Sequence, residues 1–85
     1  MKVTFRFETI LRRIINEKEE ENEFVRTVTI EEALKQISDI YEKISRGHIY
    51  TDILVNGRII TTLQGLKTKL KYGDEVTFLP LVGGG

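Results

Sequence analysis

The residues of this chain that could do chemistry stand at its end, where Val82 is followed by Gly83, Gly84 and Gly85. Glycine lacks a Cβ and adopts almost any backbone conformation, so a terminal run of it is thin enough to enter a narrow slot. The reactive group would be the carboxylate of Gly85. Because a carboxylate is a poor electrophile, it must first be converted into a derivative with a leaving group. A frayed terminus is the alternative interpretation of the same glycines.

The chain offers no means of activating this carboxylate itself. It contains no glycine-rich phosphate-binding loop of the Walker type and no cysteine, and His48 is its only histidine. No serine or acidic side chain is patterned around His48, as a nucleophile and its base would require. The sequence therefore predicts no catalytic residue and no metal site. We expect the protein not to be an enzyme, and a partner enzyme to activate its tail.

The composition limits the classes of partner. With 85 residues the chain makes one domain, near the small end of what folds alone. Its 13 basic and 13 acidic residues cancel, so it lacks the basic excess of a nucleic-acid binder. No apolar run approaches the roughly 20 residues that cross a bilayer. We therefore expect neither nucleic acid nor membrane as a partner, and a cytoplasmic location.

The first third of the chain predicts two strands joined through a short helix. Residues 2–7 alternate apolar and polar side chains, which is the period of a half-buried strand. Residues 9–16 carry apolar side chains at helical spacing over little more than one turn. The acidic run at 17–23 is expected to be a solvated connection, and residues 23–27 are expected to form the second strand.

A longer helix is predicted to begin at Thr29, because Thr29 and Glu32 have the spacing of a capping box. The apolar residues that follow recur at steps of three and four, and we expect all of them to face the core. They are Ile30, Ala33, Leu34, Ile37, Ile40, Tyr41 and Ile44. Gly47 stands where a left-handed residue would end the helix.

The remaining residues predict a hairpin, a short helical segment and a last strand. Asn56 and Gly57 favour a tight turn between residues 53–55 and 58–60. Residues 61–70 are expected to form a turn or two of helix. The last strand is expected at 75–81, with alternate side chains facing the core. A hairpin, a helix and further strands packed on it make an α+β domain.

The order of these motifs resembles a known family. A Val-Asn-Gly turn at 55–57, a Gly-Asp turn at 73–74 that leads into a strand, and a closing Gly-Gly are similar to the MoaD/ThiS family of ubiquitin-like sulfur carriers. The chain looks closest to MoaD, the small subunit of molybdopterin synthase. The resemblance implies a β-grasp fold, a mixed sheet of four to five strands packed on one main helix, with the first and last strands side by side at its centre. It also implies a domain at 1–81 and a flexible glycine tail at 82–85.

The resemblance further implies a covalent role for Gly85. In the family, an E1-like adenylating enzyme uses ATP and magnesium to make the terminal acyl-adenylate. Sulfur from a persulfide then replaces AMP and leaves a glycyl thiocarboxylate. In a complex with the large subunit of molybdopterin synthase, this group supplies sulfur for the molybdenum or tungsten cofactor. The carrier itself is expected to bind no cofactor.

The partner enzymes must also bind the folded domain. The outward-facing apolar residues beside the tail are the expected contacts, since exposed apolar side chains near a functional end often mark an interface. The predicted interface comprises Arg6, Ile59, Leu79, Pro80, Leu81 and Val82. Arg6 stands where MoaD-like chains commonly carry an aromatic residue, so its partner is expected to differ there from the usual large subunit.

Three alternatives use the same sequence features. A ubiquitin-like modifier would join Gly85 to lysines of other proteins, and its activation step would be the same. A carrier for thiazole synthesis, as in the ThiS branch, is a second alternative, although the length and the long first connection favour MoaD. A β-grasp interaction domain with inert glycines is the third.

Overall fold

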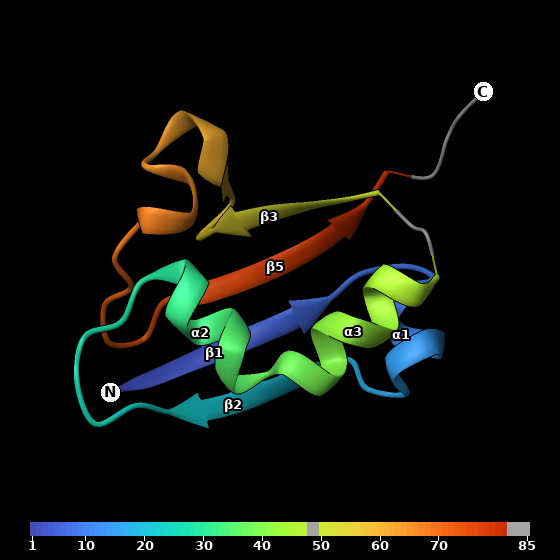
Figure 1. The fold of residues 1–85 in the computed structure, drawn as a ribbon, viewed down its shortest axis with the longest axis horizontal. Helices are drawn as coiled ribbons and strands as arrows, with labels where there is room; N and C mark the ends of the chain where they lie inside the picture. The colour runs from blue at the N-terminus through green and yellow to red at the C-terminus, as the bar shows by residue number, and fades with distance from the viewer. Residues whose placement is uncertain (48–49, 82–85) are drawn as a thin grey trace.

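The computed structural model describes residues 1–47 and 50–81 of the chain. Its strands form one five-stranded sheet in the order β2-β1-β5-β3-β4, and Figure 1 shows α2 and α3 lying across one face of that sheet. The strands are β1 (Lys2–Phe7), β2 (Glu19–Glu23), β3 (Thr51–Val55), β4 (Arg58–Ile59) and β5 (Glu75–Pro80). The helices are α1 (Leu11–Ile15), α2 (Ile30–Gln36) and α3 (Ser38–Arg46), with short 3-10 helices η1 (Ile60–Thr62) and η2 (Gly65–Lys67). This arrangement confirms the predicted α+β class.

The first and last strands lie side by side at the centre of the sheet. β1 and β5 run parallel, with Phe5 opposite Val76 and Phe7 opposite Phe78. The rings of Phe7 and Phe78 stack with their centroids 5.5 Å apart. Because successive side chains of a strand point to opposite faces, these aromatic residues all enter the core while their neighbours face outward. The central pairing implied by the family resemblance is confirmed.

The core lies between the sheet and the helices. Its buried apolar residues come from every part of the described chain, and the sheet supplies the largest side chains. They are Val3, Phe5, Phe7, Leu11, Ile15, Phe24, Val28, Ile30, Ala33, Ile37, Ile44, Val55, Ile60, Leu70, Val76 and Phe78. In this strand order, β5 lies between β1 and β3.

The predicted position of the second strand is wrong. Residues 19–23, expected as a solvated connection, form β2, which pairs antiparallel with β1 from Lys2 opposite Glu23 to Arg6 opposite Glu19. An edge strand needs a partner on one side only, so an acidic sequence can form it without an apolar face, and charged side chains there discourage pairing with other chains. Residues 24–27, expected as part of the strand, lie beyond its end; Phe24 is buried and Val25 fully exposed.

The start of α2 confirms the predicted capping box. The Thr29 side chain accepts a hydrogen bond from the Glu32 amide at 3.2 Å, and the Thr29 amide donates to a Glu32 carboxylate oxygen at 3.0 Å. Accepting this backbone hydrogen bond lowers the pKa of Glu32. A carboxylate with a lowered pKa contributes stability at pH values above its ordinary pKa. That contribution is lost as the pH falls through the lowered value.

Replacing Thr29 with alanine is expected to destabilise the domain by about 1 kcal/mol, because the Glu32 amide loses its hydrogen-bond acceptor. Urea unfolding followed by circular dichroism measures this change. Thr27→Ala is the matched control, since Thr27 is exposed in the loop before the helix. Equal unfolding free energies for the two variants would contradict the role of the cap.

The predicted single helix is divided into two. Ile37 has φ −105° and ψ 33°, which ends α2 and begins α3, although its side chain stays in the core. Serine and aspartate follow it, and both residue types favour helix starts over helix interiors. Tyr41, predicted to face the core, is 41% exposed. Gly47 has φ −74° rather than the predicted left-handed conformation, so the end of α3 was also predicted wrongly.

The predicted tight hairpin between β3 and β4 is confirmed. Asn56 and Gly57 both have positive φ, 51° and 84°, as the two central residues of such a turn require. The helical segment predicted at 61–70 occurs as the 3-10 helices η1 and η2. Among the helices of the described residues, none is long and apolar enough to cross a membrane.

Candidate functional site

The place where the tail leaves the domain is fixed by backbone pairing. β5 lies between β1 and β3, and its last residue, Pro80, is opposite Thr51. Beyond the strand, the Leu81 amide donates a hydrogen bond of 2.8 Å to the Tyr50 carbonyl oxygen. The chain is therefore held as far as Leu81. The predicted tail residues lie outside the described residues, as does His48; they are Val82, Gly83, Gly84 and Gly85.

An apolar strip runs along the outer face of the sheet, the face opposite the helices. Leu79 and Leu81 are exposed, at 38% and 49%, and Ile59 is half-buried on β4. The structure adds Leu54, which pairs with Ile59 across the hairpin. The sequence held a signal for this residue, because a two-residue turn at 56–57 places 54 opposite 59. Four apolar side chains on β3, β4, β5 and the residue after it thus share the outer face.

Pro80 does not belong to this outer face. It is buried, on the same side of β5 as the core residues Val76 and Phe78. Strand alternation explains the difference, because Leu79 and Leu81 point outward and the residue between them must point inward. Its inclusion among the predicted contact residues is therefore corrected. Pro80 instead packs in the core directly before Leu81, the last described residue, which the domain holds and which we call the tail root.

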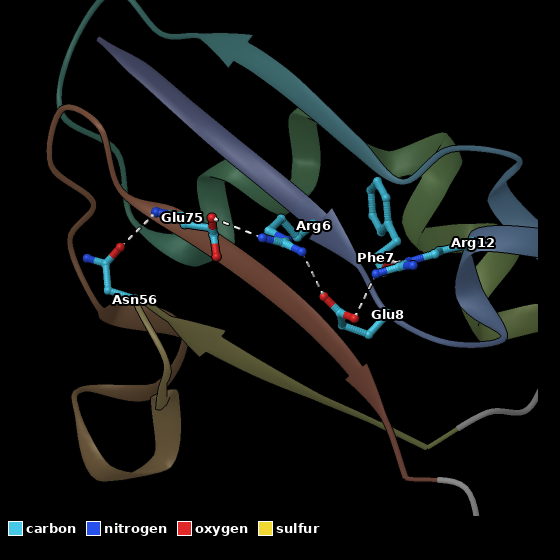
Figure 2. Close-up of polar contacts among 6 residues, drawn as sticks. All are labelled: Arg6, Phe7, Glu8, Arg12, Asn56 and Glu75. Atoms are coloured by element: carbon cyan, nitrogen blue, oxygen red, sulfur yellow. Dashed lines mark hydrogen bonds and ion pairs between the residues drawn. The ribbon is translucent and has the colours of Figure 1, made fainter.

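Arg6 lies on the outer face within a chain of charged side chains that Figure 2 shows. Its guanidinium is 3.5 Å from the Glu8 carboxylate and 3.8 Å from the Glu75 carboxylate. Glu8 also pairs with Arg12 at 3.0 Å, and the Arg12 Nε donates to the Phe7 carbonyl oxygen at 2.9 Å. Alternating charges thus connect β5, β1 and the start of α1 beside the apolar strip.

Replacing Arg6 with alanine is expected to change the unfolding free energy by less than about 1 kcal/mol, because partly exposed ion pairs contribute little to stability. Urea unfolding of the variant and of the wild-type protein measures the difference. Lys2→Ala, which removes another charged side chain of β1, is the control. A loss well above this limit would mean that the charge network holds the fold together instead of shaping its surface.

The sequence prediction missed three residues that position Arg6 or Leu81. Glu8, which directly follows β1, and Glu75, the first residue of β5, form ion pairs with Arg6. Their alternation with the neighbouring core residues was the available signal. Tyr50 carries the carbonyl that anchors Leu81 and is 72% exposed. No local pattern indicated Tyr50, because its place depends on the pairing of β3 with β5.

A mixed sheet with its first and last strands parallel at the centre, and with helices on one face, defines a ubiquitin-like β-grasp protein. The predicted β-grasp fold is confirmed. The chain belongs to the ThiS family, whose family model matches residues 6–85. It is thereby a member of a family of sulfur carriers and ubiquitin-like small modifiers, as the resemblance implied.

A similar protein of Archaeoglobus fulgidus, assigned as a candidate sulfur carrier, is 35% identical over 51 residues. The match covers 60% of this chain and 58% of the relative, so it spans less than two thirds of that protein.

The solved structures that are similar over almost the whole chain include the following three. Small archaeal modifier protein 1 of Methanosarcina acetivorans is 26% identical with a TM-score of 0.77, over 99% of this chain and 96% of that one. A protein of Pyrococcus furiosus assigned as a candidate molybdopterin converting factor, subunit 1, is 26% identical with a TM-score of 0.75, over 94% and 97%. A chain of the BexX/CysO complex of Amycolatopsis orientalis is 27% identical with a TM-score of 0.74, over 98% and 99%.

Proposed function

We propose that this protein is a sulfur carrier for molybdopterin synthesis, and that the carboxylate of Gly85 carries the sulfur atom as a thiocarboxylate. The observation that carries the proposal is the fixed exit of the tail. β5 is paired on both sides, and it delivers Leu81 at the end of the sheet with Leu79 and Leu81 exposed beside it. The similarity to a candidate molybdopterin converting factor subunit supports this branch of the family.

The chemistry would take place on a partner enzyme. A carboxylate oxygen of Gly85 attacks the α-phosphorus of ATP, and pyrophosphate leaves. The terminal sulfur of an enzyme persulfide then attacks the acyl carbon and displaces AMP. A second thiol reduces the resulting sulfur–sulfur bond and releases the thiocarboxylate. ATP and magnesium belong to the E1-like adenylating enzyme, and the large subunit of molybdopterin synthase receives the sulfur.

The folded domain would be bound by the partner enzyme and position the tail, and would not itself catalyse the reaction. Its contribution is to hold the tail root rigidly through the Tyr50–Leu81 hydrogen bond and to present a recognisable outer face. A fixed root and a thin tail let a partner place one carboxylate at its reacting nucleotide, and such positioning accounts for a large part of enzymatic rate enhancement. Because the activating step consumes ATP, we propose that the protein works in the cytoplasm.

Isotope exchange between pyrophosphate and ATP tests the adenylation step. With the cognate adenylating enzyme, exchange is expected only when the carrier is present, since the carrier supplies the carboxylate. The same enzyme with a carrier from its own established pathway serves as the positive control. Exchange in that control but none with this protein would contradict the proposal.

A protein modifier is the second candidate function. The similarity to small archaeal modifier protein 1 over 99% of this chain favours it. Activation would be the same, but a lysine amine would attack the activated Gly85 and form an isopeptide bond. Mass spectrometry of proteins from the source cells distinguishes the two, because a modifier leaves a Gly85 remnant on lysines of other proteins and a sulfur carrier does not.

A further inference from the structure

Exposed apolar side chains gather at the end of the sheet where β5 finishes. In the part of the chain that the structure describes, eight large hydrophobic residues are exposed, and five of them lie at this end: Ile10, Tyr41, Tyr50, Leu79 and Leu81. β1 ends beside β5 here, because the Glu8 amide donates to the Phe78 carbonyl oxygen at 3.1 Å. Exposed apolar groups clustered in one region indicate a surface that another molecule covers.

A pocket of about 180 Å³ opens at the same end, on the side of the sheet that faces the helices. It lies between α3 and the beginning of β3. Apolar side chains form its floor and hydroxyl-bearing side chains stand around them. The floor residues are Ile44, Ile53 and Phe78, and the hydroxyl-bearing residues are Tyr41, Ser45, Tyr50 and Thr51.

The size and lining of this pocket suit one apolar side chain. An apolar cavity of about 150 Å³ is large enough to bind benzene. A pocket of about 180 Å³ therefore has room for an aromatic ring or a leucine side chain. Sites that bind organic groups are commonly apolar with a few polar groups that fix orientation, and the four hydroxyl-bearing residues provide such groups.

The pocket is joined to the root of the tail. Tyr50, one of its walls, accepts the backbone hydrogen bond of Leu81. Four residues follow Leu81, and four extended residues reach at most about 14 Å. Any enzyme that acts on Gly85 must therefore bring its surface to within that distance of Leu81, so its body comes to lie beside the pocket.

We propose that this pocket is an anchor site for the enzyme that acts on the tail, and that it receives one aromatic or leucine side chain from that enzyme. The inference rests on the proposed function, because it takes the adenylating enzyme as the partner. The enzyme would cover the end of the sheet from Leu79 on the outer face to Tyr50. Buried aromatic and apolar anchors of this kind provide much of the affinity of protein interfaces.

Ser45→Phe tests the anchor site by filling the pocket from α3 with a side chain of the protein's own. Ser38→Phe is the matched control, because Ser38 is also an exposed serine of α3. Ser38 and Ser45 both line a neighbouring groove, but only Ser45 lines the pocket. In the pyrophosphate exchange assay we expect Ser45→Phe to raise the KM for the carrier about tenfold or more and to leave kcat unchanged. Circular dichroism confirms that both variants are folded.

Tyr50→Ala provides a second variant that removes a wall and keeps the backbone hydrogen bond to Leu81. It is expected to raise KM in the same way. Methyl signals of Ile44 and Ile53 are expected to shift when the enzyme is added to the wild-type carrier. A KM within twofold of the wild-type value for both Ser45→Phe and Tyr50→Ala would overturn the anchor site and leave the proposed function standing. No exchange with the wild-type protein would overturn both.

Discussion

Removing Gly84 and Gly85 is expected to abolish activation of this protein by the adenylating enzyme, with a loss of at least about 100-fold in the exchange rate. The truncated chain would still end in a carboxylate, that of Gly83, but two residues closer to the domain. A displacement of the reacting group by even about 1 Å can cost about 100-fold. Two residues shorten the reach by up to about 7 Å.

The truncation should leave the fold intact. All the described core residues and the last pairing of β5 lie before residue 82. Thermal unfolding of the truncated and full chains is therefore expected to coincide. The Gly84→Ala variant keeps the length of the tail but adds a Cβ. It therefore separates the effect of tail length from that of side-chain bulk in the tail. A truncated chain that is activated at the normal rate would contradict the assignment of Gly85 as the reacting residue.

Leu79→Arg is expected to weaken binding to the adenylating enzyme by about 30-fold or more. Leu79 lies on the outer face next to the tail root, and central apolar contacts of an interface cost about 2 kcal/mol or more when they are lost. Removing the arginine charge from water at the interface adds a desolvation cost. Within the domain the arginine is tolerable, since its cross-strand neighbour is Asp52 and opposite charges stabilise such pairs.

Leu66→Arg is the control for Leu79→Arg. Leu66 has a similar exposure, 45% against 38%, but belongs to η2 and not to the outer face. Titration calorimetry of the three carriers with the enzyme measures the difference. If Leu66→Arg weakened binding as much as Leu79→Arg, the outer face would not be the contact surface.

Local patterns in the sequence predicted those elements that local chemistry determines. The capping box at Thr29 and Glu32, the Asn56–Gly57 turn and the alternation of β1 were all confirmed. In each case the decisive interactions join residues that are close along the chain. The outward positions of Leu79 and Leu81 followed from the same alternation.

Pairing between distant segments explains the elements that were predicted wrongly. β2 has no apolar alternation, and its position depends on its register with β1. The break at Ile37 had a local signal in the serine and aspartate that follow it, but the apolar stripe continues through it and predicted one helix. Tyr50 becomes part of the tail root only because β3 pairs with β5. The burial of Pro80 was available from alternation but was overlooked because the residue stands among exposed leucines.

The most direct test of the central claim is the intact mass of the protein after incubation with the cognate adenylating enzyme, ATP, magnesium and a persulfide donor. We expect the whole chain to gain the mass difference between one sulfur and one oxygen atom, and a fragment spectrum to place that change on Gly85. An unchanged mass, under conditions that convert a known sulfur carrier to its thiocarboxylate, would contradict the account.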